Sequence, residues 1–148
     1  NKEKALSESF RVLAPGGILV ATTWDRVDML PLLRDIMTSV LGFEPPPPPL
    51  NPMSLAEPGM FEKLVEDAGF VDISVSTSTY PFDLGKEEDF QYSVATILVK
   101  EKLNELNAHD KAKIAFNEHK VKYTTIGSDG SMYLPTNTFK FTVATKSV

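Results

Sequence analysis

The sequence contains no cysteine and no long apolar run, and each absence removes a class of protein. Without cysteine in 148 residues there is no disulfide framework, no thiolate nucleophile and no cysteine-based metal site. No apolar run reaches the about 18 residues that a membrane-spanning helix needs, and no signal peptide is visible. We therefore expect a cytoplasmic protein.

Catalytic and ligand-binding patterns are also scarce. The sequence holds two histidines, His109 and His119, and neither has an evident partner, so exposed or helix-capping roles are favoured. No Ser-His-Asp arrangement and no metal-ligand spacing is found. The net charge of −5 argues against general affinity for nucleic acid or for anionic membranes. The length and the 42% hydrophobic content fit one globular domain with a sizeable core.

Residues 5–24 are the segment around which the chain is organised. Leu6, Phe10 and Leu13 recur at helical spacing, and Pro15-Gly16-Gly17 then interrupts the helix. Residues 18–23 are apolar and β-branched, which is typical of a buried strand. A short break between a helix and a buried strand predicts an open α/β sheet.

The next segments predict a helix, a proline-rich connection and a second helix–strand unit. Asp28 is a suitable N-cap for a helix that ends at Gly42. Five consecutive prolines lie within residues 44–52, and we favour a stiff surface spacer over a ligand for a proline-binding domain. Ser54 and Glu57 resemble a capping box, but Pro58-Gly59 moves the expected helix start nearer Gly59. That helix ends at Gly69, and residues 71–80 alternate as a strand does.

The last third predicts a helical insertion and a final strand. Residues 87–99 form one expected helix, and residues 100–120 form two pieces around 107–110. In the first helix Phe90, Val94, Ile97 and Leu98 lie three and four residues apart. In the second segment the expected inward residues are Leu103, Leu106, Ile114 and Phe116. A turn at 127–130 precedes a short strand, which Pro135 limits, and then a strand over 138–146. In that strand Phe139, Phe141 and Val143 face one way, and Lys140, Thr142 and Ala144 face the other.

Two of these segments resemble class I S-adenosylmethionine-dependent methyltransferases. Residues 8–19, ESFRVLAPGGIL, resemble the family's E-x-x-R-V-L-K-P-G-G-x-L segment, with Ala14 where lysine is common. Residues 61–73, FEKLVEDAGFVDI, resemble its L-L-x-x-A-G-F-x-x-V segment. The resemblance implies an α/β fold, the C-terminal part of a Rossmann-like methyltransferase sheet. The chain would supply the fifth, sixth and seventh strands, with the seventh inserted antiparallel between the other two.

The resemblance divides the chain as a single partial domain. Residues 1–24 are a helix–strand unit, 25–53 a helix and proline-rich connection, and 54–82 a second helix–strand unit. Residues 83–126 are a helical insertion and 127–148 the C-terminal strand. The first residues, Asn1-Lys2, include no starting methionine and no leader, so we interpret the chain as truncated.

What the family needs to bind its cofactor is missing from this sequence. Binding S-adenosylmethionine requires a glycine-rich loop after the first strand and an acidic residue after the second. The one adjacent glycine pair, Gly16-Gly17, follows a helix, and no G-x-G occurs. The resemblance thus implies S-adenosylmethionine in the complete protein and no cofactor for this chain alone. We expect the acceptor-substrate side of a small-molecule methyltransferase, inactive by itself.

The expected acceptor site lies beyond the carboxyl ends of the strands, where open α/β sheets bind ligands. Its residues are Trp24, Asp25, Met29, Leu33, Tyr80 and Phe82. Trp24 serves equally well as a half-buried lid over the core, and Asp25 and Arg26 as solvated turn residues. No catalytic residue is assigned, because methyl transfer rests mainly on holding donor and acceptor in line.

The strand Ile18 to Thr23 is expected to have an open edge, because the family's fourth strand is absent. An open apolar edge invites pairing with another chain. The expected partner is the missing N-terminal half or a second copy in a homodimer. The alternative is a non-enzymatic α/β interaction module, or a regulatory subunit, that pairs through the same edge.

Overall fold

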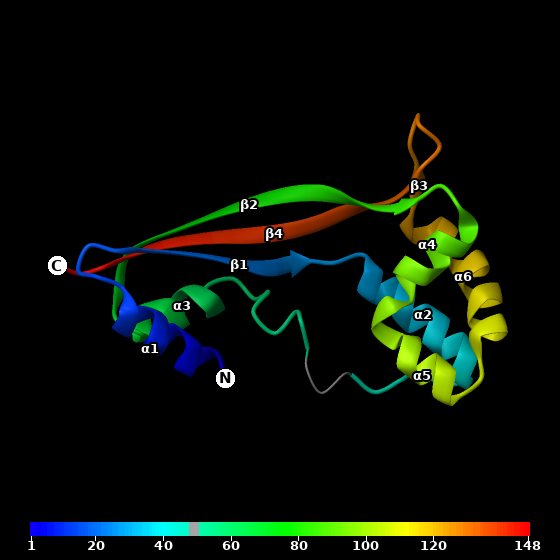
Figure 1. The fold of residues 1–148 in the computed structure, drawn as a ribbon, viewed down its shortest axis with the longest axis horizontal. Helices are drawn as coiled ribbons and strands as arrows, with labels where there is room; N and C mark the ends of the chain where they lie inside the picture. The colour runs from blue at the N-terminus through cyan, green and yellow to red at the C-terminus, as the bar shows by residue number, and fades with distance from the viewer. Residues whose placement is uncertain (48–50) are drawn as a thin grey trace. The chain divides into compact units, whose positions relative to one another are not determined.

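The computed structural model describes residues 1–47 and 51–148, in a mixed α/β fold. The chain divides into two compact units. Unit 1 comprises Asn1–Arg26, Leu50–Thr79 and Thr138–Val148, and unit 2 comprises Val27–Pro49 and Tyr80–Asn137. The elements are α1 (Lys2–Val12), β1 (Ile18–Arg26), α2 (Met29–Leu41), α3 (Met60–Asp67), β2 (Phe70–Gly85), α4 (Glu88–Ala95), the 3₁₀ helix η1 (Ile97–Val99), α5 (Lys100–Glu105), α6 (His109–Tyr123), β3 (Thr125–Ile126) and β4 (Met132–Lys146) (Figure 1).

The sheet has the strand order β1-β4-β2, so the last strand lies between two strands that precede it in the chain. β4 runs antiparallel to β1, with Ile18 opposite Thr145 and Trp24 opposite Phe139. The predicted α/β class and the predicted antiparallel insertion of the last strand are both confirmed. β3 pairs with the beginning of β4.

Helices α1 and α3 cover one face of the sheet in unit 1. The buried side chains of this core are Leu6, Phe61, Val65, Phe70 and Ala144. Gly69 permits the close packing of α1: it has φ +100, and a Cβ there would lie 3.1 Å from the Phe10 ring. The ammonium of Lys146 donates to the carbonyls of Phe10 and Leu13, which satisfies the end of α1.

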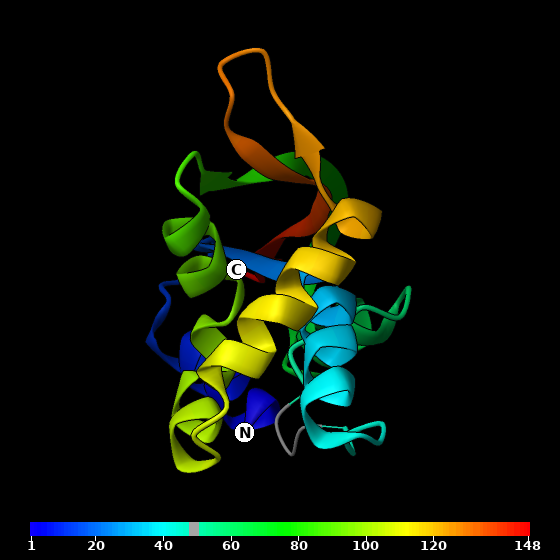
Figure 2. The ribbon, with the colours of Figure 1, turned by 90° about the vertical axis from the view of Figure 1, so that its right-hand side faces the viewer.

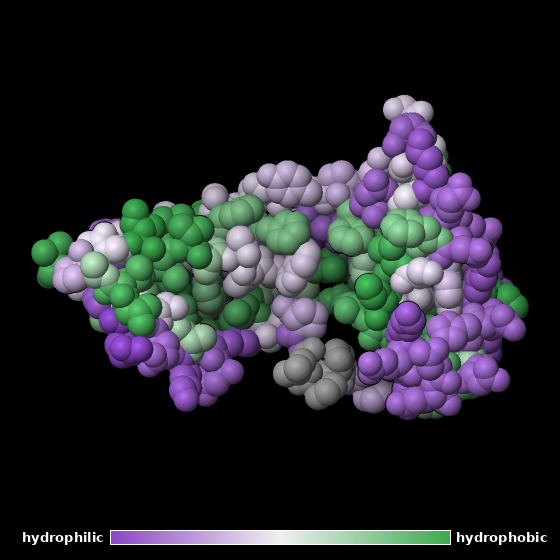
Figure 3. All heavy atoms as spheres, in the orientation of Figure 1, coloured by the Kyte–Doolittle hydropathy of each residue, from purple (hydrophilic) through white to green (hydrophobic). Residues whose placement is uncertain are grey.

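No helix among the described residues of unit 1 covers the other face, which carries apolar side chains. Ile18 and Val20 on β1 are more than 60% exposed, and Val143 opposite Val20 is also exposed. Phe139, Phe141 and Val143 alternate with Lys140, Thr142 and Ala144 as predicted, and it is the second, mixed set that is buried. Figure 3 shows a hydrophobic area over the strands of this unit.

Unit 2 is built on the packing of α2 against α6 (Figure 2). The apolar stripe of α2 supplies Leu32 and Ile36, which are fully buried, and α6 supplies Phe116. Asp28 precedes α2 as predicted, and Gly42 ends the helix with φ +81. The Asp28 side chain does not cap α2 and instead accepts hydrogen bonds from the backbone and hydroxyl of Thr136.

Several sequence-based expectations are wrong in detail. Pro135 does not end a strand: it lies within β4, between the residues that pair with β3 and those that pair with β1. The helix at 87–99 divides into α4 and η1. The buried positions of α4 are Gln91 and Ala95, and Gln91 bonds to the carbonyls of Gly85 and Lys86. Of the residues expected to face inward, Leu106 and Ile114 are exposed.

Other expectations hold. Helix α3 begins after Gly59 and not at Ser54, and the segment at 107–108 separates α5 from α6. Residues 48–50 of the proline-rich connection lie outside the described residues. The structure therefore describes only the remaining part of the predicted spacer. Within the described ranges, no helix combines the length and apolar character needed to cross a bilayer.

The buried carboxylate of Asp28 generates a stability prediction for unit 2. Replacing it by alanine leaves the Thr136 N–H and hydroxyl without their acceptor, and we expect a loss of about 2 kcal/mol in unfolding free energy. Urea unfolding followed by circular dichroism measures this loss. Asp67→Ala is the control, since its exposed ion pair with Lys63 contributes about 0.3–0.5 kcal/mol. Equal losses for the two variants would contradict the assignment.

Candidate functional site at the end of strand β1

Trp24 and Asp25 lie together near the carboxyl end of β1, as the sequence predicted. The Trp24 ring is half-buried and packs against Phe139 of β4, with ring centroids 4.2 Å apart and planes inclined by 33°. The pair belongs to the sheet face without helices, because directly opposite residues of an antiparallel ladder share a face. Trp24 therefore contributes a rigid aromatic surface at this end of the strand.

Asp25 forms an ion pair that the sequence analysis did not identify. Its Oδ1 lies 3.3 Å from Nζ of Lys140, whose side chain is only 7% exposed. Lys140 also donates to the carbonyl of Ala56, so the loop before α3 is held at the same place. The sequence did contain a sign of this. Lys140 occupies the same alternating strand positions as Thr138 and Thr142, and residues at these positions lie on the covered face.

A hydroxyl without a partner lies on the same rung of the ladder. Thr23 is directly opposite Lys140, and its Oγ1 is buried with no hydrogen-bond partner in the described part of the chain. Buried polar groups in proteins are almost always satisfied by protein, water or ligand. At the end of β1 the uncovered face thus carries an aromatic surface, and the covered face carries a neutralised ion pair and a buried hydroxyl with no partner among the described residues.

The other four predicted site residues lie in unit 2. Met29 and Leu33 are on α2 and buried in the core of that unit, so they pack there and do not stand open to solvent. Tyr80 and Phe82 are on β2 two residues apart, which places them on one face of the strand, and both are exposed. The structure therefore brings Trp24 and Asp25 together in unit 1, and Tyr80 and Phe82 together in unit 2.

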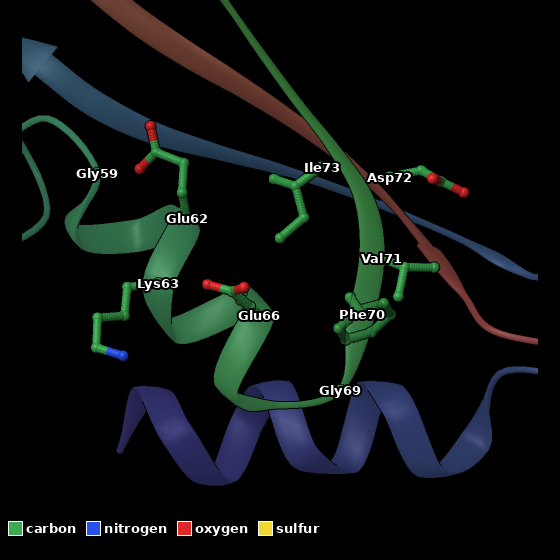
Figure 4. A pocket seen from close by; sticks show the side chains of 9 residues that line it. All are labelled: Gly59, Glu62, Lys63, Glu66, Gly69, Phe70, Val71, Asp72 and Ile73. Atoms are coloured by element: carbon green, nitrogen blue, oxygen red, sulfur yellow. The ribbon is translucent and has the colours of Figure 1, made fainter.

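A groove of about 670 Å³ lies between α3 and β2 in unit 1. Glu66 of α3 and Ile73 of β2 both line it, and Figure 4 shows the Ile73 side chain directed from β2 toward α3. Glu62 Oε2 is buried, with no hydrogen-bond partner among the described residues. The spacing of Glu62 and Glu66, one helical turn apart, is the sequence signal for this acidic wall. Within the described ranges no group of three or more acidic, histidine or cysteine side chains is arranged to hold a metal ion.

Both histidines have partners, contrary to expectation. His119 Nε2 lies 3.0 Å from the hydroxyl of Ser39, which connects α6 to α2. His109, the first residue of α6, lies 2.9 Å from the Tyr92 hydroxyl through Nδ1 and 2.8 Å from Asn104 Oδ1 through Nε2. The Ser39–His119 contact joins helices far apart in sequence, and the contacts of His109 depend on the turn between α5 and α6, so residue spacing alone did not reveal them.

Comparison with known proteins does not assign a family. No protein-family model matches the chain. Among solved structures, one similar chain is Haemonchus contortus phosphoethanolamine N-methyltransferase 2, in complex with phosphomonomethylethanolamine and S-adenosylhomocysteine. The identity is 17% and the TM-score 0.40; the match covers 99% of this chain and 30% of that chain. The present chain thus spans less than a third of that protein's length.

The Asp25–Lys140 pair generates an asymmetric prediction. Asp25→Ala leaves a buried ammonium without its carboxylate, and we expect it to cost about 2 kcal/mol of unfolding free energy. Lys140→Met should cost less than about 1 kcal/mol, because it removes the buried charge and leaves a partly hydrated carboxylate. The double variant should be more stable than Asp25→Ala alone in urea unfolding. An Asp25→Ala variant as stable as Lys140→Met would show that the pair is not a buried one.

Proposed function

We propose that this chain is the acceptor-substrate side, and the C-terminal part, of an S-adenosylmethionine-dependent methyltransferase that acts on a small molecule. The observation that carries the proposal is the strand order β1-β4-β2 with β4 antiparallel to β1. This is the arrangement that the two methyltransferase-like segments predicted for the fifth, seventh and sixth strands.

The cofactor site is supplied by a different part of the complete enzyme. The adjacent glycines of this chain serve the fold: Gly16 has φ +75, its N–H donates to the Lys146 carbonyl, and Gly17 accepts from the Lys146 N–H. Gly17 also lies so close to Ala14 that a Cβ would come within 2.8 Å of its carbonyl oxygen. This turn closes the end of the β1–β4 ladder and is not a phosphate cradle. S-adenosylmethionine belongs to the complete protein, and this chain is inactive alone.

The residues proposed for acceptor binding belong to the two units separately. In unit 1 they are Trp24 and Asp25; Trp24 is held by Phe139, and Asp25 by Lys140, so both are fixed before a substrate arrives. In unit 2 they are Met29, Leu33, Tyr80 and Phe82, of which Tyr80 and Phe82 offer exposed aromatic area and Met29 and Leu33 are buried in the core of that unit. Residues fixed in this way position an acceptor for in-line attack, which is the main catalytic requirement of methyl transfer.

The partner of this chain meets the free edge of β1 and the uncovered face beside it. In the described residues no strand pairs with the second edge of β1. Sheets with parallel strands in α/β proteins are covered on both faces, and open apolar edges pair with other chains. The partner is the cofactor-binding N-terminal half or, in its absence, a second copy of this chain.

A second candidate function is a non-enzymatic interaction module or a regulatory subunit. The same edge and the exposed Ile18, Val20 and Val143 favour it, since they serve association equally well without any chemistry. Cofactor binding by the natural assembly separates the enzyme part from a stand-alone interaction module. A regulatory subunit also pairs with a cofactor-binding chain, and it is separated from the enzyme part by a Trp24→Ala variant that leaves methyl transfer unchanged.

Calorimetric titration with S-adenosylhomocysteine tests the proposal. The 148-residue chain should show no binding heat and no thermal stabilisation, because it has no glycine-rich loop. The assembly isolated from its native source through a tag after Val148 should bind. Trp24→Ala in that assembly should lower methyl transfer at least tenfold while cofactor binding is retained; Val121→Ala, on α6, is the control. Binding by the isolated chain, or a native assembly that does not bind, overturns the proposal.

The free edge of β1 predicts self-association of the isolated chain. We expect a homodimer at high micromolar concentration in light scattering, and a monomer for Val20→Lys, which places a charge on the uncovered face. The matched control is Val121→Lys, an equally exposed valine on α6 that should leave the dimer intact. A wild-type monomer at that concentration contradicts the pairing.

A further inference from the structure

Unit 2 contains a small cavity that the sequence analysis did not anticipate. Its volume is about 350 Å³, and it lies between α4, η1, the start of α5 and the first residue of α6. Ligand-binding cavities of proteins begin at about 300 Å³. The lining residues are Phe90, Tyr92, Ser93, Val94, Thr96, Ile97, Lys100 and His109. We propose that this cavity binds a small carboxylate with an apolar body, such as an aromatic acid.

The apolar wall of the cavity is held in place although it is exposed. Phe90 lies directly over Gly85: a Cβ on Gly85 would come within 2.6 Å of the Phe90 ring. Gln91 fixes the same turn through its bonds to the carbonyls of Gly85 and Lys86. The side chain of Ile97 is 63% exposed, and that of Phe90 is exposed as well. The two side chains form an apolar surface that is open to solvent. This area is what the apolar body of the ligand covers.

The polar wall is a chain of hydrogen bonds. The Tyr92 hydroxyl lies 2.9 Å from His109 Nδ1, and His109 Nε2 lies 2.8 Å from Asn104 Oδ1. The Tyr92 ring meets the buried Phe116 edge to face, at 6.1 Å between centroids. Burial of Tyr92 raises the pKa of its hydroxyl above the ordinary tyrosine value. The orientation of both rings is therefore set before a ligand arrives.

The charge in the cavity comes from Lys100. Six lysines lie between residues 100 and 122, and five of them contact a carboxylate or a backbone carbonyl within unit 2. Lys100 forms no ion pair or hydrogen bond within the described ranges. A cation that lines a cavity without a counter-ion favours an anionic ligand. Because the remaining lining is largely apolar, the ligand is a monoanion with an apolar body.

Amide NMR titration with benzoate tests the site. Shifts should concentrate at residues 85–109, and benzamide, which has the same shape without the charge, should bind more weakly. Lys100→Gln should weaken benzoate binding about two- to fivefold, as expected for one exposed ion pair. Lys102→Gln, whose lysine pairs with Glu105 on the same helix, should leave it unchanged. Phenyl phosphate binding more tightly than benzoate would overturn the choice of a carboxylate.

A second variant separates binding from folding. Phe90→Ala removes an exposed ring and should weaken benzoate binding without lowering the melting temperature by more than about 2 °C, since exposed side chains contribute little stability. Benzoate shifts spread over both units, or equal affinities for Lys100→Gln and Lys102→Gln, would mean binding at high probe concentration only, and the proposal would be wrong.

Discussion

The antiparallel pairing of β1 with β4 is the contact on which unit 1 depends. It joins residues 18–26 to residues 138–145. At each end of the ladder, further hydrogen bonds or ion pairs hold the two strands in place. At one end the Gly16-Gly17 turn exchanges backbone hydrogen bonds with Lys146. At the other end the buried Lys140 binds Asp25 and the Ala56 carbonyl. The position of α1, the loop before α3 and the candidate site all follow from this one ladder.

The two faces of that ladder have different chemistry. The covered face is only partly apolar, since it includes Lys140 and Thr142, and it is sealed by the side chains of α1 and α3. The other face carries Ile18, Val20 and Val143 in the open. Burying apolar surface is favourable by about 25 cal/mol per Å². A partner that covers this open face therefore gains free energy of association. The proposed partner therefore follows from the burial pattern as well as from the free edge.

Much of the fold was predictable from local sequence, because helices, turns and strand alternation are recorded in residue spacing. The ends of α2 and α3 and the break before α6 were recovered in this way, whereas the insertion of β4 was implied by the family resemblance. Errors arose where a distant contact overrode the local pattern. Asp28 precedes α2 as expected, but its side chain bonds to Thr136, 108 residues away, and does not cap the helix. In the candidate site, Trp24 and Asp25 were identified from strand position, but Lys140 was not, since its partner lies 115 residues away.

The central place of β4 has a consequence for how the chain folds during synthesis. The strand that separates β1 from β2 leaves the ribosome after both of them. Until then both earlier strands lack the neighbour that pairs with them, and their backbone groups and apolar side chains are open to other chains. Contacts between residues so far apart also form slowly, because a long loop must close before they give any stability. The ladders of β1 and β2 with β4 therefore form late, after all the intervening residues have been made.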